Sequence, residues 1–506
     1  MYTHSSSASS QRPPSKVAPC PAQQLAPPQR QRLAVDALAG SQPITRLAEE
    51  HDVSRKFVYQ QADKAQQALD QAFVPRRADQ RVLFYLPVTK ALLRQLVLGL
   101  VLICHSSFRG VVAFLRDLFD YPLSVGTVAN IVHAAVGPAR RANEAQELSG
   151  VRVGVHDEIY QAGQPVLVGA CAHSTYCYLL SQEEECDAET WAVRLWELQD
   201  RGLDPEATVA DGGTALRAGQ EMAMAGVPCR GDVFHILYDW GKVLRQLETL
   251  AYAAVTKRLD LDRQLATPGK RRDRNKGSLH ARRRLARAAE AKAVALYDDL
   301  ALLRRWLRED ILALVGPNYA TRRALFDFVI AEVQARVPLG PPGIKELCQS
   351  LSYQRETLLA FVQPLDEGLA DLAARSHVPE FLVRELLWVQ TRSQKSERRW
   401  QRDAVLRRQL GWRYHALSVA VAQLARRAVR ASSVAENLNS RLRCYFFLRR
   451  ALGPDYLALL QFFLNHRRFE RSEHGERVGQ SPAELLTGQE HPHWLELLGY
   501  QRFKRA

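Results

Sequence analysis

The sequence predicts an α/β core, a mixed sheet with flanking helices, that is interrupted by a large all-α insertion and preceded by α-helical domains. Three strand-like runs rich in β-branched residues lie within Val151–Ser181. An amphipathic stretch follows at Asp187–Arg201, and a short apolar run at Ala207–Ala210 indicates a fourth strand. Beyond His235 the spacing of apolar residues is helical as far as about residue 430, with breaks at prolines.

Two of the predicted strands end in acidic residues. Asp157 and Glu158 close the first strand, and Asp211 follows the fourth. Successive strand residues face opposite ways, and Asp157 shares the parity of the valines before it, so we prefer Asp157 to Glu158. Carboxylates that converge from separate strand ends are what a divalent-metal site for phosphodiester chemistry needs. Asp211 also has a simpler interpretation, as the first residue of a turn with the two glycines that follow it.

The composition favours a polyanionic partner. The chain of 506 residues has 69 Lys and Arg against 54 Asp and Glu, which gives a formal net charge of +15. Its 8 cysteines include no Cys-x-x-Cys pair, so neither a disulfide framework nor a zinc ribbon is indicated. The most apolar run, Leu96–Cys104, is too short to span a bilayer, and no phosphate-binding loop indicates ATP use.

The N-terminal part of the chain predicts a helix-turn-helix. Residues 1–30 are rich in Ser, Pro and Gln without periodicity, and we expect them to be disordered. Within 31–76 a helix, a tight turn and a second helix follow one another, and Ser54 suits the N-cap of the second helix. An ordinary helical hairpin is the simpler alternative. The exposed side of the second helix, which we expect to contact DNA, carries Arg55, Lys56, Tyr59 and Gln60.

A second helical, helix-turn-helix-like domain is predicted over residues 81–146. Phe108–Phe119 is amphipathic, a turn follows around Pro122, and Ser124 is a good N-cap for another helix. Two successive units of this kind would read a long DNA site in two parts. A purely structural helical bundle is the alternative.

Three further segments complete the predicted organisation. They are a first core segment (150–260), the helical insertion (261–430), and a last core helix with a basic C-terminal tail (431–506). A basic run in the insertion favours phosphate contacts, although such a run is usually a solvated face. The cations of this run that we expect to contact DNA are Lys270, Arg271, Arg272 and Arg274.

The late helix supplies a third acidic candidate. Glu436, Asn439 and Arg443 share one face of it by helical spacing. Arg441 of the same helix is a candidate DNA contact. Ser433-x-x-Glu436 equally fits a capping box, in which Glu436 would only stabilise the start of the helix.

Together these residues resemble the DDE transposases of the ribonuclease H-like, retroviral-integrase superfamily. The motifs that carry the resemblance are His156-Asp157-Glu158, Ala210-Asp211-Gly212, Asp232-x-x-His235 and Glu436-Asn437-x-Asn439. The Asp-x-x-His pattern is similar to a signature of insertion-sequence families with a helical insertion. The gap of 225 residues between Asp211 and Glu436 (436 − 211) fits such an insertion. The resemblance implies a ribonuclease H-like catalytic core that the insertion divides.

The resemblance also implies roles for the site residues. Asp157, Asp211 and Glu436 would be catalytic and hold two Mg²⁺ (or Mn²⁺) ions, as in-line phosphodiester chemistry requires. Glu385 and Glu397 are the fallback third acids if Glu436 is only a cap. The residues implied to support the active site are Asp232, His235, Asn439 and Arg443.

The function implied is that of a DNA transposase. It would bind the terminal inverted repeats of its mobile element through the helix-turn-helix units, cleave the DNA strands and join them to target DNA. The alternatives are a DNA-binding regulator or decayed transposase without nuclease activity, and a ribonuclease H-like nuclease without strand transfer. We expect a homodimer or higher oligomer on double-stranded DNA, in the cytoplasm and nucleoid-associated when bound, without a membrane or nucleotide partner.

Overall fold

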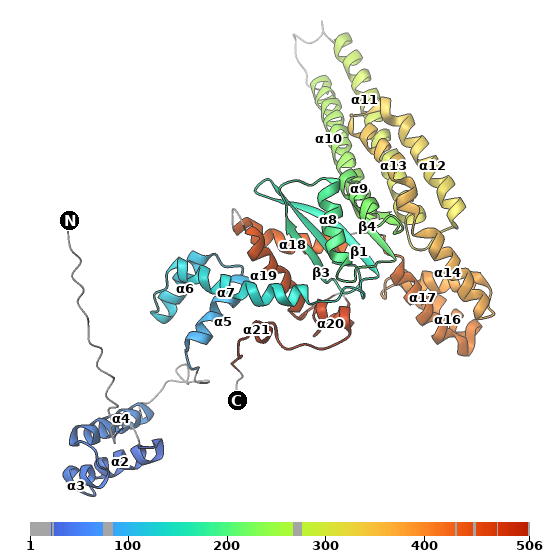
Figure 1. Ribbon diagram of the computed structural model, residues 1–506. Coiled ribbons are helices and arrows are strands. Elements are labelled where there is room, and N and C mark those ends of the chain that lie inside the picture. Colours follow the sequence, from blue (N-terminus) through green and yellow to red (C-terminus); the bar gives the residue numbers. More distant parts are fainter. Residues whose placement is uncertain are drawn as a thin grey trace, which may run out of the picture. The chain divides into compact units, whose positions relative to one another are not determined.

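The computed structural model contains two compact units, one ending at Pro87 and the other beginning at Val88. Its described part is mostly helical and has one mixed five-stranded sheet with flanking helices (Figure 1), which agrees with an α/β core plus helical regions. No helix in this part is both long and apolar enough to cross a membrane. The described residues are 22, 25–73, 84, 86–266, 276–430, 433–448, 452–472 and 474–503, so the expected disorder of 1–30 falls mostly outside them.

The described part of the first unit contains three helices. They are α2 (Pro27–Ala39), α3 (Ile44–Glu50) and α4 (Arg55–Phe73). The Ser54 hydroxyl accepts the backbone N–H of Phe57 at 3.2 Å, so it caps α4 as its sequence position predicts. A short turn thus joins α3 to α4, and Arg55, Lys56, Tyr59 and Gln60 are exposed on α4. The buried residues of the small core are Leu33, Leu47, Ala48 and Val58.

A mixed sheet forms the centre of the second unit. The first three strands pair antiparallel, whereas β4 runs parallel to β1 and β5 runs parallel to β4. Parallel neighbours need a crossover connection, and here helices provide it. The spatial order is β3-β2-β1-β4-β5, with β1 in the middle. The strands are β1 (Val153–Gln161), β2 (Gln164–Cys171), β3 (Cys177–Gln182), β4 (Ala207–Ala210) and β5 (Cys229–Gly231).

Helices cover both faces of this sheet (Figure 1). On one face, α8 (Ala188–Gln199) and α9 (Thr214–Ala223) share a core with Leu167 of β2. Val166 and Val168 belong to the core on the other face, because successive side chains of a strand point to opposite sides. The helices of that second core include α7 (Val125–Glu144), α18 (Ser433–Leu448) and α19 (Gly453–His466).

The segment 81–146, predicted as a second helix-turn-helix-like domain, folds differently in one respect. Its described helices are α5 (Lys90–Leu102), α6 (Phe108–Phe119) and α7, and Ser107 and Ser124 cap the last two as expected. However, α7 packs along α19, and the apolar sides of α5 and α7 share their core with the sheet. The segment therefore belongs to the second unit and does not form a compact unit of its own.

A large helical body lies between β5 and α18. It begins at Val233, earlier than the predicted boundary at 261, because α10 already contributes Val233, Ile236 and Trp240 to its core. The predicted phosphate contacts Lys270, Arg271, Arg272 and Arg274 lie outside the described residues. The elements are α10 (Val233–Ala266), α11 (Lys276–Trp306), a π-helical turn (Leu307–Ile311), α12 (Tyr319–Arg336), α13 (Gly343–Leu359), α14 (Val362–Arg375), α15 (Glu380–Thr391), α16 (Glu397–Leu410) and α17 (Tyr414–Arg427), with 3₁₀ turns at Val337–Leu339 and Gly411–Arg413.

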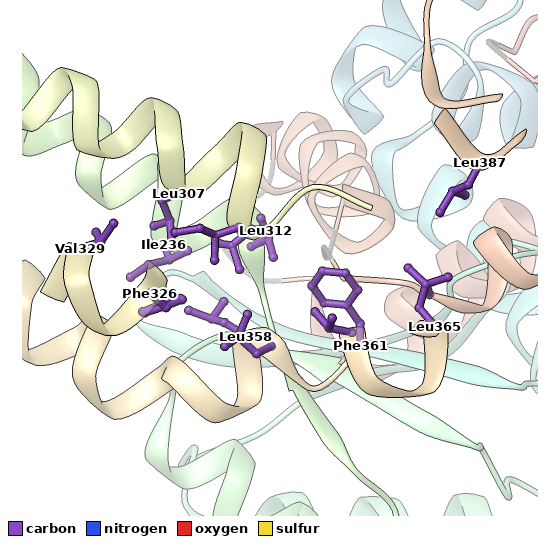
Figure 2. Close-up of a cluster of buried hydrophobic side chains, with 14 of the residues drawn as sticks. Ile236, Leu307, Leu312, Phe326, Val329, Leu358, Phe361, Leu365 and Leu387 are labelled. Carbon is purple, nitrogen blue, oxygen red and sulfur yellow. The ribbon is translucent and has the colours of Figure 1, made fainter. Parts of the chain in front are cut away.

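The helical body has its own apolar core, part of which Figure 2 shows. Ile236 of α10 and Phe326 of α12 are buried in it with Leu358 at the end of α13. Buried Arg322 fixes the loop after the π-helical turn, since its guanidinium donates to the carbonyl oxygens of Ile311 and Pro317, both at 2.7 Å. This core lets the body be large without sharing the side chains that stabilise the sheet.

The C-terminal segment returns to the sheet. The side-chain oxygen of Asn465 in α19 accepts the backbone N–H of Cys177 in β3 at 2.7 Å. The basic loop that follows ends at Ser481, which caps the short helix α20 (Pro482–Thr487). A 3₁₀ turn (Gly475–Arg477) and a last short helix, α21 (Trp494–Leu497), complete the described tail.

A glycine at the contact of α8 and α9 provides a test of this packing. A Cβ atom on Gly219 would lie 2.5 Å from the Ala188 carbonyl oxygen and 2.5 Å from Trp191 Cβ. We expect Gly219→Ala to lower the free energy of unfolding by about 1–3 kcal/mol, as overpacking does. Urea denaturation would measure the change. Gly226→Ala, where an added Cβ would meet no atom within 4 Å, is the control, and an equal loss there would contradict the packing argument.

Candidate active site

Pairing of β1 with β4 brings the first two predicted acids to one side of the sheet. The two strands are in parallel register, with Val153 opposite Ala207 and Val155 opposite Val209. Asp157 stands two residues after Val155, and Asp211 stands two residues after Val209. The two acids therefore lie next to each other on the same face of the sheet. Together with Glu436 they form what we call the acid cluster.

Helix α18 brings Glu436 and Asn439 to this face. Ala435 of α18 is buried among Val153, Val155 and Val209, which anchors the start of the helix on the strands that carry the acids. The Asn439 amide donates to Asp157 Oδ2 at 2.7 Å. Two chain segments that are distant in the sequence therefore meet in a direct hydrogen bond.

Helix α10 brings His235 into the same group. Its Nε2 lies 3.1 Å from Glu436 Oε1, and its Nδ1 lies 2.5 Å from Asp232 Oδ2. Asp232 is fully buried, and its Oδ1 accepts the backbone N–H of Phe234 at 2.7 Å. Ligand atoms of Asp157, His235 and Glu436 all lie within 4.8 Å of one another. His235 is therefore more central than the supporting role implied by the sequence.

The environment shifts the pKa values of two members of this group. Burial raises the pKa of Asp157 to about 7, although the nearby charge of His235 opposes the shift. Burial by itself would lower the pKa of His235, but the hydrogen bond and charge of Asp232, with the charges of Asp157 and Asp211, raise it to about 9. At neutral pH His235 is thus an imidazolium that balances part of the negative charge around it.

Asp211 stands slightly apart from this tight group. Its Oδ1 accepts the backbone N–H of Gly213 at 2.8 Å, so the turn role considered for it is present. Its charge nevertheless acts on both Asp157 and His235. The close group therefore contains Asp157 and Glu436, two of the three predicted metal-binding acids. Its third member is His235 and not Asp211.

The other predicted site residues lie in different surroundings. Glu158 is on the opposite side of β1, where burial raises its pKa and the Cys186 thiol donates to it at 3.4 Å. Glu385, a fallback acid, is paired with Arg402 on the helical body. The remaining three are Glu397, exposed at the start of α16, Arg443, exposed on α18, and Arg441, half-buried on α18 near Tyr445.

The group has donors that suit a hard divalent cation. Carboxylate oxygens from Asp157, Asp211 and Glu436 are the ligand type that Mg²⁺ and Mn²⁺ prefer. Ionising the buried Asp157 is unfavourable without a compensating positive charge, which a cation would supply. The side-chain oxygen of Asn439 is also buried without a hydrogen-bond partner among the described residues. The residues present therefore fit such an ion.

Neither a protein-family model nor a curated protein sequence matches this chain.

His235 should stabilise the fold in a pH-dependent way. Its pKa is raised above the unfolded value, so the stabilisation is complete below about pH 6.5 and is lost as the pH rises through about 9. We expect His235→Gln to lower the free energy of unfolding by up to about 3 kcal/mol near pH 6 and by much less near pH 10. Urea denaturation in a chelator measures both. His280→Gln, on an exposed site of α11, is the control, and a pH-independent loss for His235→Gln would contradict the charge argument.

Proposed function

We propose that this chain is a DDE transposase of the ribonuclease H-like superfamily, which cleaves and joins DNA strands with divalent metal ions. The observation that carries the proposal is the convergence of three acids from distant chain segments. Asp157 lies in the middle of β1 and not at its end as the sequence predicts, because β1 continues to Gln161. Asp211 directly follows β4, which is parallel to β1, and Glu436 comes from a helix beyond a large inserted body. The hydrogen bond from Asn439 to Asp157 joins the third segment to the first.

The arrangement of the sheet supports the same proposal. Three antiparallel strands, then two parallel strands reached through helices, place the first and fourth strands side by side. This is the arrangement we expect for a ribonuclease H-like core, and the helical body enters it between the second and third acids. A basic chain of this kind would act on double-stranded DNA, at element ends and target, as a homodimer or higher oligomer in the cytoplasm.

Each residue of the site would have a defined role. Asp157, Asp211 and Glu436 would hold Mg²⁺ or Mn²⁺, and such ions activate the attacking oxygen and stabilise the leaving oxygen. Asn439 fixes the orientation of the Asp157 carboxylate. Asp232 holds the ring of His235, which in turn positions Glu436. Arg55, Lys56, Tyr59 and Gln60 of α4 would read the DNA ends.

Removing any acid of the cluster should abolish cleavage and leave DNA binding largely intact. We expect Asp157→Asn, Asp211→Asn and Glu436→Gln to give no detectable strand cleavage, because each removes a cation ligand. Cleavage of duplexes that carry the sequences flanking the gene should require Mg²⁺ or Mn²⁺, whereas Ca²⁺ should support binding alone, since its coordination is longer and less strict. Glu158→Gln, on the opposite side of β1, is the matched control.

Three outcomes would contradict this proposal. Near-normal cleavage by one of the acid variants would exclude that residue from the site. Binding by the wild-type chain without any cleavage in Mg²⁺ or Mn²⁺ would favour a DNA-binding regulator. Cleavage without joining would favour a nuclease that does not transfer strands.

Sequence preference should reside in α4. Arg55→Ala with Gln60→Ala should reduce the preference for element ends over unrelated DNA, because each specific base contact is worth about 1–3 kcal/mol. Competition binding at fixed salt would measure it. Arg32→Ala on exposed α2 should weaken binding to all sequences alike, and an unchanged preference in the α4 variant would place recognition elsewhere.

A further inference from the structure

A large cleft opens on the helical body, and no residue of the acid cluster lines it. Its volume is about 1080 Å³. Its walls are the loop after the π-helical turn, the end of α15, the start of α16 and one side of α17. On α17 the lining residues Ser418, Ala422 and Ala425 recur at helical spacing and have short side chains, so an elongated ligand can lie close to the helix.

The cleft is strongly cationic. It has five arginines and two carboxylates, Glu309 and Asp310, which leaves an excess of three positive charges. Arg399 and Arg430 donate to the carbonyl oxygens of Val389 and Leu312, at 3.0 and 2.7 Å, which fixes their positions without neutralising them. The five arginines are Arg308, Arg392, Arg399, Arg426 and Arg430.

Few of these charges are balanced by the protein itself. Arg308 is paired with Glu309, and Arg426 lies 3.7 Å from Glu476 at the surface. Arg392, Arg399 and Arg430 have no ion-pair partner within the part of the chain that the structure describes. Three unbalanced guanidinium groups from separate elements of one cleft indicate an anionic ligand.

Two buried polar atoms at the cleft also lack partners. Arg399 Nη1, a donor, and Gln390 Oε1, an acceptor, have no hydrogen bond among the described residues, and both side chains line the cleft. Buried groups of this kind are nearly always satisfied in folded proteins. Both atoms lie beneath the surface of the cleft, so they add polar groups to its wall but are not themselves exposed to a ligand.

The cleft is linked to the acid cluster through the backbone. The Arg430 carbonyl oxygen accepts the N–H of Val233 at 2.9 Å, and Val233 directly follows Asp232, the partner of His235. Arg430 also stands six residues before Glu436 in the sequence. A displacement of Arg430 in the cleft wall would therefore move the start of α10, which carries His235, and the start of α18, which carries Glu436.

We propose that the cleft binds a single DNA strand next to the cleavage position, with its arginines on successive phosphates. The volume is that of a large ligand pocket and suits one strand of a few nucleotides. The inference rests on the proposed function and adds to it a separate strand-binding site. Arg392 and Arg426 are both exposed in this cleft, so they are the cations chosen for the test.

The test compares paired variants of the full-length chain in Ca²⁺, so that binding is measured without cleavage. The probe is a fluorescein-labelled duplex with a single-stranded flank, and a blunt duplex of the same sequence is the second probe. Arg392→Gln with Arg426→Gln should weaken binding of the flanked probe about tenfold and make its slope of log affinity against log salt shallower by about 1.4, or about 0.7 for each lost phosphate contact. The blunt probe should be bound as by the wild type.

Matched variants separate the possible outcomes. Arg263→Gln with Arg375→Gln removes two exposed arginines outside the cleft and should leave the salt dependence of binding as in the wild type. Arg392→Lys with Arg426→Lys keeps both positive charges, so most of the wild-type slope should be retained. Unaltered flank binding by the Gln pair would overturn the inference and leave the proposed function standing, because the wild-type chain still binds DNA. An equal loss of affinity for the flanked and the blunt probe in the Gln pair would also overturn the inference. Failure of the wild-type chain to bind either probe would overturn both proposals.

Discussion

Parallel pairing of β1 with β4 is the constraint on which the rest of the site depends. It places Asp157 of β1 beside Asp211, which follows β4, and Asp157 is buried there whereas Asp211 is half-buried. Burial disfavours ionisation of Asp157, and the like charge of Asp211 adds to this effect. The imidazolium of His235 and the amide of Asn439 offset part of the cost. The starts of α10 and α18 are accordingly fixed against the same sheet edge.

The helical body keeps a separate core, which explains how a long insertion can divide a small sheet domain. Most of its apolar side chains pack with one another, and Ala435 of α18 packs on Val153, Val155 and Val209 together with half-buried Val429. The sheet end of the body is held by main-chain contacts, such as that between Arg430 and Val233. The insertion can therefore vary in its outer helices without moving the acids.

Much of the arrangement followed from local patterns. Strand parity selected Asp157 over Glu158, and helical spacing grouped Glu436 with Asn439, because these signals need only a strand or helix to be present. The start of the helical body at Val233 did not follow, since α10 runs unbroken from Val233 to Ala266 and no break in the sequence marks where its packing changes. The cleft arginines could not be grouped from the sequence, because they come from five separate segments and no sequence spacing indicates their proximity. In the sequence, His235 is recognisable only as part of the Asp-x-x-His motif. Its position between Asp232 and Glu436 depends on the fold, which brings α18 to α10.

The distance between the second and third acids also orders events in time. At about 5–20 residues per second, a ribosome needs about 11–45 s to add the 225 residues from Asp211 to Glu436 (436 − 211). Throughout that interval strands β1 to β4 and helix α4 are already synthesised, whereas the helix that completes the acid cluster is not. A polypeptide released early, before α18, would retain α4 and lack the third acid. If the proposed function holds, it would bind the same DNA without cutting it and would compete with the full-length chains made from the same message.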